Sequence, residues 1–202
     1  STLKKTTFHF NTKVNTVKGN QIILEDGANI NSDCIVIATE ASKLLGLEKS
    51  ILWKSCDTLY FEVEHNTLKK PIIGLIVNES ALINNIFCTT SIENNNTNKA
   101  QVLSVTIVKE HHLNENELIE QVKMELEQHC KIITKRFIKR YSIKKALPDV
   151  EQVRYENSLN PLQYSEDIYL AGDHHLNGSL NAAMSSGALV AKLISNRFES
   201  KD

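Results

Sequence analysis

The first fifty residues alternate short apolar runs with polar turns, a pattern typical of a small β-sheet. Three segments are expected to be extended: 6–10, 13–17 and 21–24. Asp26-Gly27 predicts a hairpin back to residues 28–32, because glycine accepts the positive φ that such turns require. The run Cys34–Ala38 lacks polar residues and predicts a strand covered on both faces, after which residues 41–47 have helical spacing.

Residues 55–147 have a different pattern, in which strands precede and follow one long helix. The expected strands are 58–63, 72–77, 83–90, 101–108 and 137–143, with a polar surface turn over 93–98. Asn114 and Glu117 form a capping-box pair at the helix start. Apolar side chains then recur every four residues and predict its buried stripe: Leu118, Val122, Leu126 and Cys130. The pattern predicts an α+β module of antiparallel character.

The C-terminal part begins with a short buried strand at 168–171, which ends at Gly172-Asp173. A loop containing Gly178 leads into a helix expected over 179–197. Small residues gather on one side of this helix: Ala182, Ala183, Ser186, Gly187 and Ala191. Small side chains allow a helix to approach a sheet or a ligand closely. The sequence therefore divides into residues 1–50, 51–150 and 151–202.

Composition excludes several classes of function. The chain has 202 residues, 41% of them hydrophobic, which is enough for a packed core. Its 23 Lys and Arg residues balance 24 Asp and Glu residues, so no nucleic-acid partner is expected. Neither an apolar run long enough to span a membrane nor a signal peptide is recognisable, so we expect a cytoplasmic protein.

The cysteines and histidines give no metal site. The four cysteines have no C-x-x-C spacing and are expected to be reduced and mostly buried: Cys34, Cys56, Cys88 and Cys130. The pairs His111-His112 and His174-His175 are expected on the surface or in loops, because adjacent strand residues point to opposite faces. Contact between His174 and a bound cofactor or substrate remains open. The cations of 131–145 predict a solvated strand rather than an RNA-binding face.

The part of the sequence that indicates chemistry is the C-terminal segment, in which a strand is followed by Gly172-Asp173, a loop and a helix. A strand end followed by a helix start exposes backbone N–H groups at a crevice, and the helix dipole there favours an anion or an electron-rich ring edge. The carboxylate of Asp173 could accept hydrogen bonds from sugar or ribityl hydroxyls. These features predict a bound cofactor.

Segments 168–173 and 178–187 resemble the C-terminal FAD motif of the flavin-containing amine oxidase superfamily, which includes monoamine oxidases, protoporphyrinogen oxidase and phytoene desaturase. The hairpin to residues 25–27 and the strand 33–39 are similar to its adenine-side meander and returning strand. Residues 141–148 resemble the return from its substrate domain. The resemblance implies a substrate-binding α+β domain at 51–150, flanked by parts of an FAD-binding Rossmann-like domain.

The resemblance also implies a role for particular positions. Asp173, after Gly172, would hold the ribityl chain, and the backbone at Ser179, Leu180 and Asn181, after Gly178, would face the pyrimidine side of the flavin. Val14 would touch adenine, and Ala38 and Thr39 would lie along the dinucleotide. The cofactor carries most of the chemistry, so no catalytic residue is named.

The glycine-rich G-x-G-x-x-G turn of the family is absent. With Ser1 in place of an initiator Met, we expect the C-terminal half of an FAD-dependent oxidoreductase, inactive and without FAD on its own. The parent enzyme would oxidise a C–N or C–C bond of an amine, porphyrin or polyene by hydride transfer. Exposed faces favour a homodimer. The alternatives are a flavin-free binding or interaction module and, more weakly, a nicotinamide enzyme.

Overall fold

The computed structural model describes residues 5–48, 50–64, 68, 70–92, 100–150, 153 and 162–199. The fold is α+β, as the sequence predicts. It has two compact units. The first unit combines Ser1–Leu52 with Pro148–Asp202, and the second is the continuous segment Trp53–Leu147. The first unit is therefore built from two stretches of chain that are far apart in the sequence.

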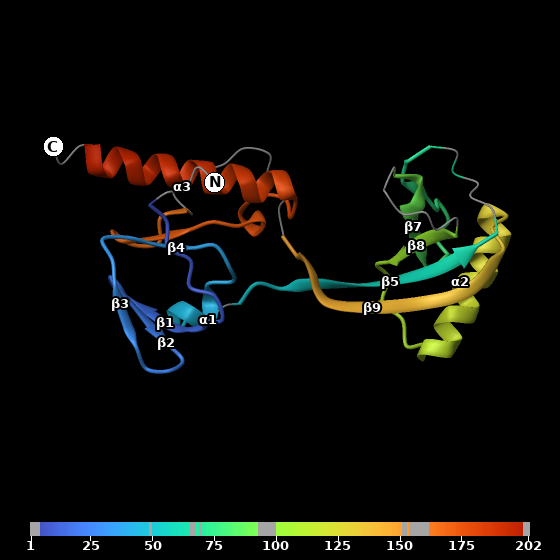
Figure 1. The fold of residues 1–202 in the computed structure, drawn as a ribbon, viewed down its shortest axis with the longest axis horizontal. Coiled ribbons are helices and arrows are strands. Elements are labelled where there is room, and N and C mark those ends of the chain that lie inside the picture. Colours follow the sequence, from blue (N-terminus) through green and yellow to red (C-terminus); the bar gives the residue numbers. More distant parts are fainter. Residues whose placement is uncertain are drawn as a thin grey trace. The chain divides into compact units, whose positions relative to one another are not determined.

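An antiparallel three-stranded sheet opens the first unit (Figure 1). Its strands are β1 (Val14–Lys18), β2 (Gln21–Leu24) and β3 (Asn29–Asn31). The hairpin at Gly27 is confirmed, since this residue has φ of 87° and lies between β2 and β3. The prediction of an extended segment at 6–10 is wrong. Phe8 and Phe10 are exposed there and stack on each other, so no core side chain fixes a strand.

A second, two-stranded sheet in this unit pairs β4 (Ile35–Ile37) with β10 (Ile168–Leu170) in parallel. Helix α1 (Ser42–Leu45) follows β4, the 3-10 turn η3 (Asp173–His175) follows β10, and α3 (Leu180–Glu199) comes last. The prediction that β4 is covered on both faces is wrong for the described residues. Val36 is 44% exposed, whereas Ile35 and Ile37 are buried.

The core of the first unit consists of two apolar clusters. One joins Val17 of β1 to Ile35 and Ile37 of β4. The other joins Tyr169 and Ala171 to Val190 of α3. Figure 1 shows α3 running beside the parallel pair. The helix start is thereby brought to the end of β10, where the sequence predicts the cofactor.

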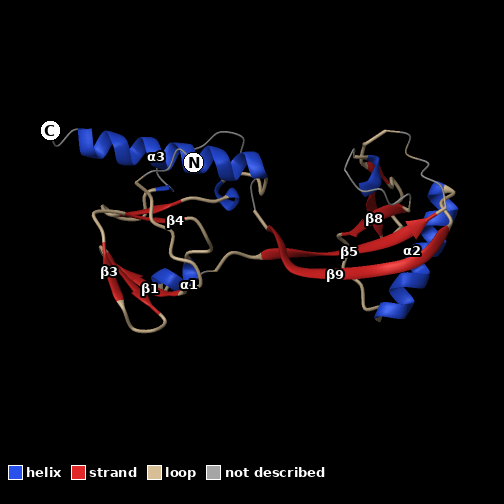
Figure 2. Ribbon diagram, in the orientation of Figure 1, coloured by secondary structure: helices blue, strands red, loops and turns tan. Residues whose placement is uncertain are grey.

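The second unit is a five-stranded sheet in the order β6-β7-β8-β5-β9 (Figure 2). Its elements are β5 (Trp53–Val63), β6 (Gly74–Leu75), β7 (Ile83–Cys88), η1 (Thr89–Ser91), β8 (Gln101–Ile107), α2 (Glu115–Cys130) and β9 (Thr134–Pro148). The pairs β6–β7, β7–β8 and β8–β5 are antiparallel, as predicted. Strand β9 is longer than the predicted 137–143, and the predicted turn at 93–98 lies outside the described residues.

Helix α2 covers this sheet with an apolar stripe. The capping box is confirmed, because the Asn114 side chain accepts from the Glu117 N–H and the Glu117 carboxylate accepts from the Asn114 N–H. Leu118, Val122 and Leu126 are buried as predicted, while Cys130 is half-buried. These side chains pack against alternating residues of β5, β7 and β8. The stripe therefore positions α2 on the sheet.

The described cysteines are free thiols, as expected. Only Cys88 is buried, whereas Cys34, Cys56 and Cys130 are half-buried, so the expectation that most are buried is wrong. In the described part of the chain, no three His, Cys, Asp or Glu side chains cluster closely enough for a metal ion. None of the helices described is both long and apolar enough to cross a membrane.

Candidate functional site

The carboxyl ends of β4 and β10 meet at one edge of the parallel pair. Leu170 is aligned with Ile37, and the Ala171 N–H donates to the Ile37 carbonyl at 2.9 Å. Ala38 and Thr39 directly follow β4, and Gly172 and Asp173 follow β10 after Ala171. The structure therefore brings these four predicted residues to the edge where open α/β sheets bind their ligands.

The turn after β10 is held closely to helix α3. The Gly172 N–H donates to Ser186 Oγ at 2.9 Å, and this buried hydroxyl donates to the Ala183 carbonyl at 2.8 Å. A Cβ on Gly172 would lie 2.5 Å from a ring carbon of His174. Ser186 therefore ties the turn to the helix, and the glycine at 172 leaves room for the His174 ring within the turn.

The start of α3 provides backbone donors beside this turn. Gly178 has φ of 65°, and its N–H donates to the Asp173 carbonyl at 3.1 Å. Ser179 Oγ accepts from the Ala182 N–H at 3.1 Å and so caps the helix. Leu180 and Asn181 then occupy the first two helical positions, whose N–H groups have no intrahelical acceptor. Their dipoles favour negative charge at this edge.

The residues present fit a flavin dinucleotide. The Asp173 side chain is 33% exposed and can accept hydrogen bonds from hydroxyl groups. The first N–H groups of α3 can donate to a polar ring edge, and the exposed Leu180 and Met184 offer an apolar face one helical turn apart. Acceptor, donors and apolar surface are the three kinds of contact that such a cofactor requires.

Val14 is the predicted contact that lies elsewhere. It begins β1 in the three-stranded sheet, and its side chain packs against the cluster that contains Ile35 and Ile37. This packing accounts for an apolar side chain at position 14. The role of its backbone beside adenine stays a prediction.

His174 and His175 lie in the turn that follows β10 and are partly buried beside Asp173. Their ring centroids lie 4.1 Å apart. Burial, together with the neighbouring His174, lowers the pKa of His175 to about 4, and burial also lowers the pKa of His174. Among the described residues, His175 Nε2 is a buried atom that has no hydrogen-bond partner. Both rings are therefore neutral at pH 7.

The lowered pKa of His175 predicts a dependence of stability on pH. An unfolded histidine titrates near 6.5 and the folded one near 4, so the unfolded state binds more protons between these values. The contribution of His175 to stability is then complete above pH 6.5 and is lost as the pH falls toward 4. We expect the free energy of unfolding to fall by at most about 3 kcal/mol over this pH range, and urea unfolding at several pH values measures the change.

The His175→Phe variant serves to isolate this contribution. It should unfold with a smaller pH dependence than the wild type, while replacement of the exposed His112 by phenylalanine should leave the dependence unchanged. Equal pH dependence in His175→Phe and the wild type would contradict the prediction.

A buried cluster of charged residues lies in the second unit. Asp57 of β5 is 8% exposed. Its carboxylate accepts from Arg140 Nε at 2.9 Å, Arg140 Nη2 at 3.0 Å and His111 Nε2 at 2.9 Å. Burial by itself raises the pKa of Asp57, but hydrogen bonds from Arg140, His111 and Ser142 outweigh this effect and lower the pKa. Asp57 is therefore ionised, and the hydrogen on His111 Nε2 points to it.

Sequence reasoning missed this cluster. It assigned His111 to the surface or a loop and Arg140 to a solvated strand, yet both side chains are largely buried. One signal was present: Asp57 has the same alternation as Leu59, Phe61 and Val63, which all face the core. A carboxylate at a core-facing strand position requires partners, because an unpaired buried charge is very unfavourable.

The cluster forms one wall of a pocket of about 470 Å³ within the second unit. Strands β5, β8 and β9 and the segment before α2 line it: Ser55, Cys56, Asp57, Ile107, Lys109, Glu110, His111, His112, Leu113, Arg140, Ser142 and Lys144. Most of these residues are polar. The described residues therefore offer two candidate sites, the carboxyl edge of β4–β10 and this polar pocket.

Comparison with known proteins identifies a family. A family model described as flavin containing amine oxidoreductase matches residues 1–195. A search of curated protein sequences finds no match.

Several solved structures share the fold at low sequence identity. Reduced UDP-galactopyranose mutase has a TM-score of 0.69 and 14% identity over 94% of this chain and 48% of its own. A protein from Exiguobacterium sp. 255-15, described as a protoporphyrinogen oxidase, has a TM-score of 0.64 and 16% identity. The match covers 93% of this chain and 47% of that protein. A double mutant of putrescine oxidase has a TM-score of 0.54 and 10% identity, and the match covers 90% of this chain and 49% of the oxidase. The chain thus spans about half the length of these proteins.

Proposed function

Because the chain belongs to the flavin-containing amine oxidoreductase family, we propose that it forms the C-terminal half of an FAD-dependent oxidoreductase. The enzyme oxidises a C–N or C–C bond of a small molecule. The observation that carries this proposal is the meeting of Asp173, Thr39 and the start of α3 at one edge of a parallel strand pair. The matched solved proteins, about twice as long as this chain, support the proposal that it is one half.

Each residue at this edge has a defined part in the proposal. When bound, FAD supplies the acceptor for the hydride that leaves the substrate. Asp173 accepts hydrogen bonds from the hydroxyls of the cofactor, and the N–H groups of Leu180 and Asn181 favour negative charge at the ring edge. The neutral His175 adds no competing positive charge next to Asp173. The unit Trp53–Leu147 holds the substrate.

The parallel pair itself supports the proposal that further strands complete the sheet. Parallel sheets are normally covered on both faces and contain more than two strands. Here Val36 of β4 is exposed. We propose that a segment outside the 202 residues covers this side chain and contributes the turn that binds the pyrophosphate.

The test is flavin binding by the full-length protein. We expect it to purify with flavin absorbance, and the Asp173→Ala variant to bind FAD about 10- to 100-fold more weakly, because a hydrogen bond to a charged acceptor is lost. Asp33→Ala is the matched control, since this exposed carboxylate precedes β4 at the opposite end of the strand. Its affinity for FAD should equal that of the wild type.

Two results would contradict the proposal. One is a folded, colourless full-length protein that takes up no added FAD, which would favour a flavin-free binding module. The other is equal FAD affinity in Asp173→Ala and Asp33→Ala. The 202-residue chain alone, which we expect to bind no FAD, provides the baseline for the titration.

A further inference from the structure

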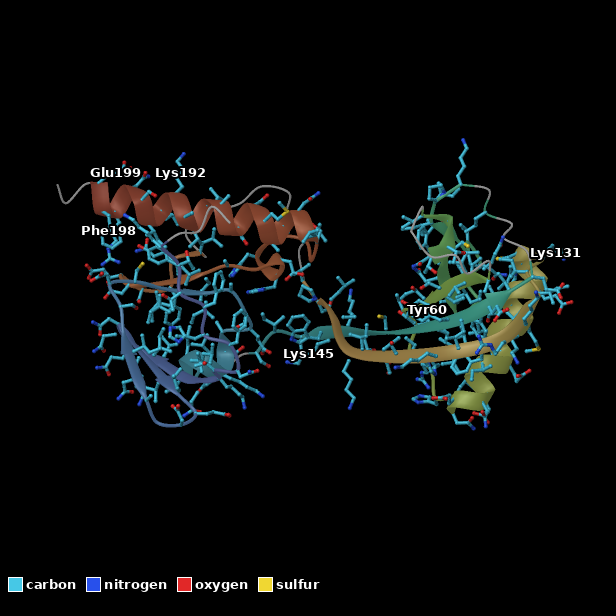
Figure 3. The ribbon with its side chains drawn as sticks, viewed as in Figure 1. Tyr60, Lys131, Lys145, Lys192, Phe198 and Glu199 are labelled. Atoms are coloured by element: carbon cyan, nitrogen blue, oxygen red, sulfur yellow. The ribbon has the colours of Figure 1, made fainter. Side chains whose placement is uncertain are left out.

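One face of β9 supplies polar side chains to the pocket of the second unit. Arg140, Ser142 and Lys144 all line it, as expected for alternate residues of a strand. Lys145, labelled in Figure 3, instead lies over the Trp53 ring at 5.4 Å. The sheet thus directs one guanidinium, one hydroxyl and one ammonium group to the same space.

The carboxylate of Asp57 fixes two of the groups in the pocket wall. It binds Arg140 through Nε and Nη2, so the planar guanidinium directs its remaining Nη1 away from Asp57. It also accepts from His111 Nε2, which fixes the plane of the imidazole ring. Because both side chains are already ordered, a ligand that binds them has less conformational entropy to overcome.

The second nitrogen of His111 gives an independent indication of a ligand. The His111 side chain is 10% exposed, and its Nδ1 is buried without a hydrogen-bond partner among the described residues. Most buried polar atoms have a partner, so an unpartnered one in a pocket wall points to a ligand. Because Nε2 faces Asp57, Nδ1 is the ring atom that is left to contact a ligand.

The balance of charge determines the sign of that ligand. Lys109, Arg140 and Lys144 line the pocket, against the two carboxylates of Asp57 and Glu110. Arg140 already neutralises Asp57. Lys109 is held in place because its Nζ donates to the carbonyls of Glu79 and Ala81. This arrangement disfavours a cation and favours a negatively charged group.

We propose that this pocket is a binding site for a carboxylate or phosphate group, bound by Arg140, Lys144 and His111. The inference goes beyond the proposed function, because the site lies wholly within the second unit and requires no flavin. The volume of about 470 Å³ leaves room for a larger molecule that carries the anionic group.

Titration calorimetry with the full-length protein tests the site, with inorganic phosphate and succinate as separate probes at constant ionic strength. We expect at least one probe to bind, and Lys144→Ala to weaken its binding about 10-fold through loss of a charge-assisted contact. Arg140→Lys keeps a positive charge beside Asp57 but loses the planar guanidinium with its several donors. This variant should therefore also bind the probe more weakly. The probe that binds more tightly identifies the anionic group.

The matched control is Lys139→Ala, which removes the same charge from the same strand. Lys139 lies over the Tyr141 ring at 4.8 Å and is not among the residues that line the pocket. Its variant should bind the probe within about twofold of the wild type. The proposal is overturned if neither probe binds the folded protein, or if Lys139→Ala and Lys144→Ala weaken binding equally. Flavin content is measured separately, so failure here leaves the proposed function intact.

Discussion

Replacing Glu125 by alanine is expected to lower the free energy of unfolding by about 4 kcal/mol, since one buried and one partly buried N–H group lose their acceptor. Glu125 is buried in α2, where sequence reasoning expected only an apolar stripe. Its carboxylate accepts from the Leu82 N–H at 2.9 and 3.0 Å and from the Ile83 N–H at 3.0 Å. The Gln121 side chain also donates to it, at 2.9 Å. Glu125 therefore fastens the helix to the start of β7.

Urea unfolding of Glu125→Ala measures this loss. Glu127→Ala is the matched control, because this residue is exposed on the same helix and its change should alter stability by less than about 0.5 kcal/mol. Glu125→Gln retains one oxygen acceptor, so its free energy of unfolding should lie between those of Glu125→Ala and Glu127→Ala. Equal unfolding midpoints for Glu125→Ala and Glu127→Ala would show that the carboxylate does not hold the helix to β7.

The second large effect is expected from Asp57→Ala, which should cost about 3–5 kcal/mol because Arg140 loses its buried counter-charge. The sign of the pH dependence follows from the lowered pKa of Asp57. Asp57 stabilises the fold at pH values above its unfolded pKa, which is near 4, and this stabilisation is lost as the pH falls through the lower folded pKa. The difference between wild type and variant should therefore be constant at neutral pH and shrink in acid.

Glu62 provides the control for Asp57 on the same strand. It pairs with Arg136, whose side chain is 69% exposed, so Glu62→Ala should cost no more than about 1 kcal/mol. Comparison of the two variants by urea unfolding at neutral pH separates a buried pair from a surface pair. Similar losses in both variants would rule out the buried cluster as a main contributor to stability.

Features that depend on neighbouring residues could be predicted from the sequence. The hairpin at Gly27 and the capping box of Asn114 and Glu117 each require only a few adjacent positions. Long apolar alternation likewise predicted β8 well. The extent of β9 was underestimated, because the exposed positions at its two ends do not show the apolar alternation that defines a strand in sequence. The exposure of Val36 could not be predicted, because an apolar run does not specify what covers it.

The two candidate sites differ in how far their residues are separated along the sequence, and this decides which of them could be predicted. The edge at Gly172-Asp173 was found because strand, turn and helix are consecutive in the sequence. The Asp57 cluster joins residues separated by 54 and 83 positions, and no local motif connects them. Only the tertiary fold brings them together.

The discontinuous first unit has a consequence for how the protein folds. Strand β4 precedes the second unit and its partner β10 follows it, so during synthesis β4 must wait until the whole insert has been made. Closing so long a loop is slow when the intervening chain is unfolded. Here the Asp149 N–H donates to the Leu52 carbonyl at 2.8 Å, which joins the two ends of the insert. An insert that folds first therefore shortens the effective loop that must close before β4 and β10 can pair.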